Sequence, residues 1–253
     1  MFDNKGALGI LCSGMLLVCI GTATGELENT GKTNDPGKPI PKHPFNDNVT
    51  VTVTDTHLIV ESDGIPNHET GKFPNRDNPN RILKQHYRFY IPLKPRIAEQ
   101  PRKTPFGPIG VAINGIPFYN QYNAEGQDAV QVEKFDSCCG HPDPNGRYHY
   151  HKYPVCLKSP FHDEPGKHSP PIGYAFDGFA IYGPNGEGGK PPTDLDECNG
   201  HSDKERGYHY HVTAKFPYIL GAYRGVVEEK NLTRPGRSPS DRPPRKPPLE
   251  SKD

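Results

Sequence analysis

The sequence predicts one domain of the all-β or β-rich class, built on two pseudo-repeated hairpin-plus-strand units, with a sandwich and a barrel both left open. Three observations predict it. A segment that ends in Tyr-His-Tyr-His occurs twice, at 138–151 and 198–211, with eight of 14 positions identical. Upstream of each copy lies an Asn-Gly or Asp-Gly pair flanked by apolar residues, the signal of a tight hairpin. No segment carries a convincing 3.6-residue apolar stripe.

The N-terminal residues predict export. An apolar run at 8–20 follows Lys5 and precedes small residues at 21–25. This pattern predicts a signal peptide over 1–25, because so short a run cannot span a bilayer. The protein is therefore expected to be secreted and extracellular, with no membrane segment in its mature form. Polar, Pro-rich stretches at 26–47 and 231–253 predict disordered flanks, the second one mildly basic.

The domain is expected over 48–230. Runs of β-branched and aromatic residues at 49–60 and 86–93 predict strands, and 128–135 predicts one short helical turn. The repeats follow at about 108–151 and 171–211, the hairpins offset by 63 residues and the histidine segments by 60. Basic and acidic residues balance at 30 each, so nothing in the charge indicates nucleic acid as a partner.

The repeated histidines are the candidate functional residues. Alternate side chains on a strand share a face, so His149 and His151 lie together, about 7 Å apart at Cα, and can converge on one ion. A third histidine stands at the matching position of each copy, and neutral imidazole suits copper and zinc. A structural ladder of hydrogen-bonded histidines is the alternative. The predicted metal ligands are His141, His149 and His151, and His201, His209 and His211.

Other polar residues receive secondary roles. Asp143 and Asp203 follow the third histidines by two residues and are predicted to orient an imidazole. His162 and His168 have no counterparts in the repeats and are interpreted as surface residues. The tyrosines of the repeated segments, Tyr148, Tyr150, Tyr208 and Tyr210, are expected to pack in the core or at an interface. The isolated histidines, His43, His57, His68 and His86, receive no functional role.

The cysteines predict disulfides. Cys12 and Cys19 leave with the signal peptide, and export favours disulfides over thiolate ligands for the rest, which are Cys138, Cys139, Cys156 and Cys198. Four cysteines allow three pairings, and neighbouring cysteines bridge only with strain, so Cys138–Cys139 is the least favoured bridge. Of the pairings that remain, Cys138–Cys198 with Cys139–Cys156 is favoured, because the first bridge joins equivalent points of the repeats. Two sequons, at Asn48 and Asn231, predict glycosylated surface segments.

The repeated segments carry a family resemblance. Tyr148-His-Tyr-His151 and Tyr208-His-Tyr-His211, each preceded by Gly-His-x-Asp, resemble the YHYH-domain family, as do the apolar segments around Asn114-Gly115 and Asp177-Gly178. The resemblance covers roughly residues 85–225. It implies a mostly exported protein and carries no established biochemical activity.

Several functions fit these features. The leading hypothesis is an exported β-domain protein that binds copper or zinc through the duplicated histidines. No hydrolase, nucleotide-binding or metalloprotease motif is present, and no separate general acid or base can be named. A non-enzyme is therefore favoured over a copper-dependent oxidoreductase. The alternatives are a non-catalytic extracellular matrix component, including one of a mineralised matrix, with matrix macromolecules as partners, and a carbohydrate-binding module. The acidic loop 194–197 is interpreted as exposed and not as a calcium site.

Overall fold

The computed structural model describes residues 43–158 and 164–233, all within the unit Ile40–Asp253. The predicted signal peptide, His162, most of the N-terminal flank and nearly all of the tail lie outside these residues. Phe45 is buried, and Asn46 donates its backbone N–H to the carbonyl of Ile113. The packed chain therefore begins before residue 48, and the flank predicted at 26–47 is too long at its C-terminal end.

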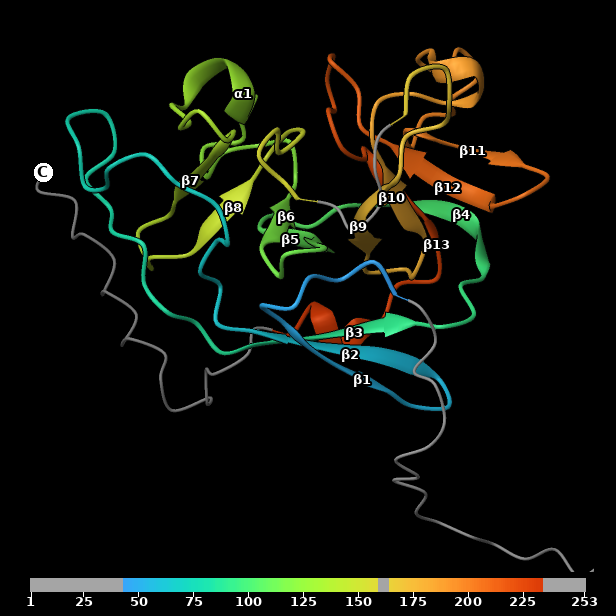
Figure 1. Cartoon of the computed structure of the whole chain (residues 1–253), viewed down its shortest axis with the longest axis horizontal. Coiled ribbons are helices and arrows are strands. Elements are labelled where there is room, and N and C mark those ends of the chain that lie inside the picture. The colour runs from blue at the N-terminus through green and yellow to red at the C-terminus, as the bar shows by residue number, and fades with distance from the viewer. Residues whose placement is uncertain (1–42, 159–163, 234–253) are drawn as a thin grey trace, which may run out of the picture. The chain divides into compact units, whose positions relative to one another are not determined.

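The predicted strand at 49–60 forms two strands, β1 (Thr50–Val53) and β2 (His57–Ser62). The Thr54 hydroxyl accepts the backbone N–H of His57 and closes the turn between them. β3 (Tyr87–Pro92) confirms the strand predicted at 86–93 and pairs antiparallel with β2. These strands make a three-stranded sheet in the order β1-β2-β3, drawn in blue to green in Figure 1.

The two repeats form one eight-stranded sheet. Its strands are β5 (Pro108–Ala112), β6 (Pro117–Tyr119), β7 (Gly140–Pro142), β8 (Tyr148–Tyr150), β9 (Pro171–Ala175), β10 (Ala180–Tyr182), β11 (Gly200–Asp203) and β12 (Gly207–His211). The order β11-β12-β10-β9-β5-β6-β8-β7 places equivalent strands symmetrically about the β5–β9 pair. The domain is β-rich as predicted, and no sheet of the described residues closes into a barrel.

Glycine allows the two repeats to meet closely at the centre of this sheet. A Pro-Ile-Gly-x-Ala segment forms both β5 and β9, which pair antiparallel with Val111 opposite Tyr174. A Cβ on Gly110 would lie 2.6 Å from the carbonyl oxygen of Tyr174, and one on Gly173 would lie 2.3 Å from that of Val111. Only residues without a side chain fit at these two positions.

The predicted hairpins are confirmed. Gly115 and Gly178 have φ values of 80° and 90°, in the left-handed region that glycine adopts without a steric penalty. β5 pairs antiparallel with β6 through the first turn, and β9 with β10 through the second. The predicted helical turn is also present as α1 (Ala129–Val132).

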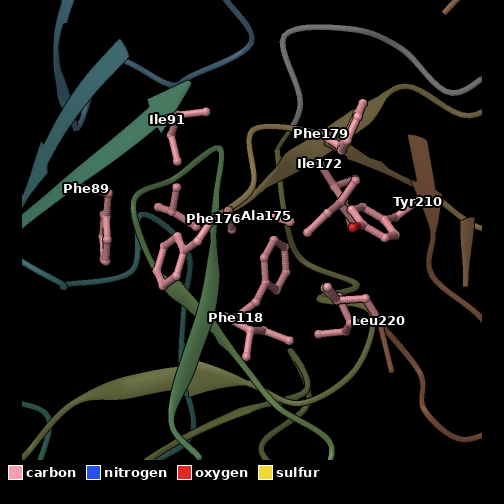
Figure 2. Close-up of a cluster of buried hydrophobic side chains, with 14 of the residues drawn as sticks. Phe89, Ile91, Phe118, Ile172, Ala175, Phe176, Phe179, Tyr210 and Leu220 are labelled. Atoms are coloured by element: carbon pink, nitrogen blue, oxygen red, sulfur yellow. The ribbon is translucent and has the colours of Figure 1, made fainter. Parts of the chain in front are cut away.

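The core lies between the three-stranded sheet and the centre of the eight-stranded sheet. Phe89 of β3 stacks on Phe176 of the second hairpin turn at 5.6 Å, and Figure 2 shows Phe118, Tyr210 and Leu220 in the same buried cluster. Each fully buried side chain of this size stabilises the fold by roughly 1.5–3 kcal/mol. The remaining elements are β4 (Ile97–Lys103) and β13 (Ala222–Gly225), which pair, and the 3-10 turns η1 (Glu187–Gly189) and η2 (Glu229–Asn231). No helix in the described residues is long and apolar enough to cross a bilayer.

The described residues contain one disulfide, and it corrects both predicted pairings. Cys138 is bonded to Cys156, while Cys139 and Cys198 are free. Cys138 lies two residues before the edge strand β7, and Cys198 lies two residues before the opposite edge strand β11. Because strands lie about 4.8 Å apart, equivalent points on opposite edges of this sheet are far beyond the ~7 Å limit for a bridge. Cys138 and Cys198 occupy equivalent positions of the two repeats, and for that reason they lie at opposite edges of the sheet.

Candidate metal-binding sites

Strands β7 and β8 bring three histidines of the first repeat together. His141 lies opposite His149 in the antiparallel register, and His151 follows on the same face. The Nε2 atom of His149 lies 3.1 Å from that of His141 and 3.0 Å from that of His151. All three side chains, called here the first cluster, are buried.

Strands β11 and β12 repeat this arrangement and add a fourth histidine. The Nε2 atom of His209 lies 3.2 Å from the Nε2 atoms of both His201 and His211. It also lies 3.2 Å from Nε2 of His168, which corrects the interpretation of His168 as a surface residue. This second cluster of four is more open, because His168 and His201 are half-buried. His168 comes from the loop before β9, where the repeat offers no counterpart.

The second ring nitrogen of every cluster histidine is held by an acceptor. Each Nδ1 donates its proton over 2.6–3.0 Å. The acceptors are the backbone carbonyls of Asn120, Lys134, Arg147, Ser169, Gly183 and Gly207 and the carboxylate of Asp194. A carbonyl oxygen can only accept, so the proton of the neutral ring is on Nδ1 and the Nε2 lone pair faces the cluster.

The two clusters have the geometry of metal-ligand sets. Unprotonated Nε2 atoms cannot hydrogen-bond to one another, so their lone pairs repel across 3.0–3.2 Å. An ion about 2.05 Å from each nitrogen would make N–metal–N angles of roughly 95–105°, near the tetrahedral value. Carbonyl acceptors on the other ring nitrogen are also the usual support of ligating histidines. Both clusters could therefore hold a metal ion.

Burial favours the neutral form of the most buried cluster imidazoles, and the neutral form is the one that binds metals. Desolvation lowers the pKa of His151 to about 4 and that of His211 to about 3, each against an ordinary 6.5. The pKa of His149 is also lowered well below its ordinary value, by desolvation and then by its two histidine neighbours. Protons therefore compete weakly for these nitrogens at neutral pH.

Part of the chain matches a known protein family. Residues 88–190 match the model of the family described as YHYH protein. The chain contains a YHYH domain. No curated protein and no solved structure matches the chain. The match confirms the resemblance inferred from the motifs, over a shorter range.

The YHYH domain match covers the two clusters unequally. It includes the whole first cluster, and of the second cluster it includes only His168. Strands β11 and β12, with the second Tyr-His-Tyr-His segment, lie beyond residue 190. The second cluster is therefore recognised from the internal repeat and not from the family match.

The two aspartates predicted to orient imidazoles do not do so. Asp143 accepts hydrogen bonds from Arg147 and from Tyr119, and it closes the turn between β7 and β8. Asp203 pairs with Arg206 in the equivalent turn, and its nearest approach to His209 Nε2 is 3.9 Å. Short turns need acceptors for their own N–H groups, and these carboxylates are used there.

A second pair of aspartates, not predicted from the sequence, positions the strands that carry the histidines. Asp136 accepts the backbone N–H groups of Cys138 and Gly140, and Asp196 does the same in the second repeat. Each also accepts the hydroxyl of the first tyrosine of its Tyr-His-Tyr-His segment. These carboxylates tie the start of β7 or β11 to the neighbouring strand. Extending the repeat two residues upstream would have revealed them, since they too are 60 residues apart.

Glu133, also unpredicted, faces the first cluster. Its Oε2 atom lies 3.6 Å from Nε2 of both His141 and His151. This oxygen is buried and has no hydrogen-bond partner. Desolvation, and then the charge of Glu125, raises the pKa of Glu133. The equivalent position of the second repeat is Thr193, so comparison of the two repeats does not single out Glu133.

The remaining predicted residues have mainly structural positions. Tyr148, Tyr150 and Tyr210 are fully buried, as expected of core aromatics. Two further tyrosines contact the clusters: Tyr119 stacks on His149 at 3.8 Å, and Tyr182 lies edge-on to His209.

The isolated histidines and the sequons lie apart from the clusters. His57 bonds Glu228 and His68 bonds the hydroxyl of Tyr150, whereas His43 is half-buried and His86 is exposed. Asn48 is exposed, while the amide of Asn231 bonds the backbone of Tyr90 in β3. Glycosylation of either asparagine stays a prediction.

Proposed function

We propose that this protein is an exported metal-binding protein that holds two ions, of copper or zinc, one in each histidine cluster. One observation carries the proposal: seven Nδ1 atoms are fixed by acceptors while the Nε2 lone pairs converge at 3.0–3.2 Å. In a ladder of hydrogen-bonded histidines, a protonated ring nitrogen would face an unprotonated one. In these clusters unprotonated Nε2 atoms face one another.

Copper and zinc suit these donors best. Neutral imidazole is a borderline ligand that both ions accept, and the clusters contain no thiolate. The signal-peptide pattern and the Cys138–Cys156 disulfide favour an oxidising, extracellular location.

The test is metal content and affinity of the secreted protein. Purified protein is expected to retain close to two ions per chain by elemental analysis. His149→Ala with His151→Ala should remove one ion, and His209→Ala with His211→Ala should remove the other, because each pair supplies two ligands of one site. His86→Ala is the matched control, since His86 is exposed and outside both clusters.

A second measurement separates folding from binding. Far-ultraviolet circular dichroism of the metal-free variants should match that of the metal-free parent. If folded parent protein, supplied with Cu²⁺ or Zn²⁺ at micromolar concentration, binds neither ion, the proposal is wrong and the histidines are structural.

A further inference from the structure

Glu133 is positioned at the edge of the first cluster by the end of α1. Its backbone N–H donates to the carbonyl of Ala129 and closes the helical turn. The side chain then extends toward the histidines, where Oε2 lies 3.6 Å from two Nε2 atoms. The carboxylate therefore faces the same point as the imidazole lone pairs.

This oxygen lacks the partner that a buried carboxylate needs. Oε2 of Glu133 has neither a hydrogen bond nor solvent contact, and the neighbouring imidazoles present acceptors to it. In the second repeat the carboxylate of Asp203 lies 3.9 Å from Nε2 of His209, but it is paired with Arg206. Burying an unpaired carboxylate oxygen is costly, and a cation between it and the imidazoles would remove that cost.

We propose that Glu133 is the fourth protein ligand of the first site, which makes this a three-histidine, one-carboxylate site, whereas the second site has four histidines. The inference rests on the proposed function. It assigns the two sites different donor sets despite their common repeat, because Glu133 and His168 are supplied by segments outside the repeated strands.

The distances allow this coordination. With metal–nitrogen and metal–oxygen bonds of about 2.0 Å, an N–O distance of 3.6 Å corresponds to an N–metal–O angle of about 128°. That angle is within the range of a distorted tetrahedral site. A divalent ion would then carry a net charge of +1 in the first site and +2 in the second.

The experiment isolates the first site in a His209→Ala, His211→Ala background. Zn²⁺ affinity is measured by competition with a chromophoric chelator, and the ligand set is followed by the visible spectrum of bound Co²⁺. Glu133→Gln, which keeps the shape of the side chain, should weaken Zn²⁺ binding by about tenfold or more and change the Co²⁺ bands. Glu125→Gln is the control, because it removes a nearby negative charge that is not positioned as a ligand. It should change affinity by less than about twofold.

Glu133→His provides an independent variant if Glu133→Gln folds poorly. It converts the first site to four imidazoles, and its Co²⁺ spectrum should approach that of the second site measured in a His149→Ala, His151→Ala background. Unchanged affinity and spectrum in Glu133→Gln would overturn the assignment of Glu133 while the two-site proposal stands. Absence of metal from the first site in the parent background overturns the proposed function itself.

Discussion

At the scale of single residues, the main-chain carbonyls decide the chemistry of the histidines. Six of the seven cluster rings donate Nδ1–H to a carbonyl that is itself fixed in a strand or turn. The backbone therefore selects the tautomer and the ring orientation before any ion binds. Asp194 is the exception, and its carboxylate bonds His201 at an exposed position.

The buried histidines predict how the stability of metal-free protein depends on pH. Folded His151 and His211 have pKa values of about 4 and about 3, whereas in the unfolded chain both return to about 6.5. Below pH 6.5 the unfolded chain therefore binds more protons than the folded one, and the free energy of unfolding falls as pH falls. Each histidine contributes up to about 1.4 kcal/mol per pH unit down to its folded pKa.

Urea denaturation in the presence of a chelator, from pH 7 to pH 4.5, measures this slope. His151→Gln with His211→Gln should be less sensitive to pH than the parent. The comparison removes the effect of acids such as Asp177, whose pKa is raised by burial and whose contribution has the opposite sign. Parallel slopes in parent and variant would contradict the prediction.

The sequence predicted the cluster histidines whose positions follow from local geometry. Alternation along a strand is a property of neighbouring residues, so a His-x-His segment indicates its shared face without knowledge of the fold. Glu133 and His168 were missed because they reach the clusters from the end of α1 and from the loop before β9, and the positions of both segments depend on long-range packing. Asp143 and Asp203 were assigned the wrong partner, because closing their turns requires their carboxylates.

At the scale of elements, the two repeats close the same loop by different means. In the first, the Cys138–Cys156 disulfide joins the start of β7 to the chain after β8. In the second, the amide of Asn199 donates to Thr213 and to the carbonyl of Ile219, linking the start of β11 to the chain after β12. One closure is covalent, and the other depends on hydrogen bonds.

The covalent closure predicts a specific loss of stability. Cys156→Ser opens a loop with a sequence separation of 18 and should lower the free energy of unfolding by about 3 kcal/mol. Cys139→Ser, which breaks no bridge, should have an effect below about 1 kcal/mol. Chemical denaturation of both variants tests this. Alkylation before digestion should label Cys139 and Cys198 only, and equal stability of the two variants would refute the role of the bridge.

At the scale of the whole described domain, neither repeat is complete alone. The β5–β9 pair joins the repeats, and β4 from before the first repeat pairs with β13 from after the second. This second pairing was not predicted, because β4 is polar and contains Pro101, features that argue against a strand. The pseudo-repeat predicted the symmetry of the sheet, but only the structure shows that β4 and β13 pair and so join the segments before and after the repeats.

Separate fragments 43–158 and 164–233 are therefore expected to be unfolded on their own. Each would expose an unpaired central strand and part of the core. An equimolar mixture should recover a protease-resistant complex with the secondary structure of the parent, measured by limited trypsin digestion and circular dichroism. A single fragment that resists trypsin and binds one ion would show that the repeats fold independently.

The self-complementary register at the centre of the sheet also has an evolutionary consequence. Gly110 faces Ala175 and Ala112 faces Gly173, so each strand pairs with its own counterpart. Such an isologous contact is the kind that two identical subunits make across a dimer axis. An ancestral chain with a single repeat could have built the same eight-stranded sheet as a homodimer with two identical sites. Fusion of its gene to a second copy would then have allowed the two sites to diverge, so that one could gain a carboxylate and the other a fourth imidazole.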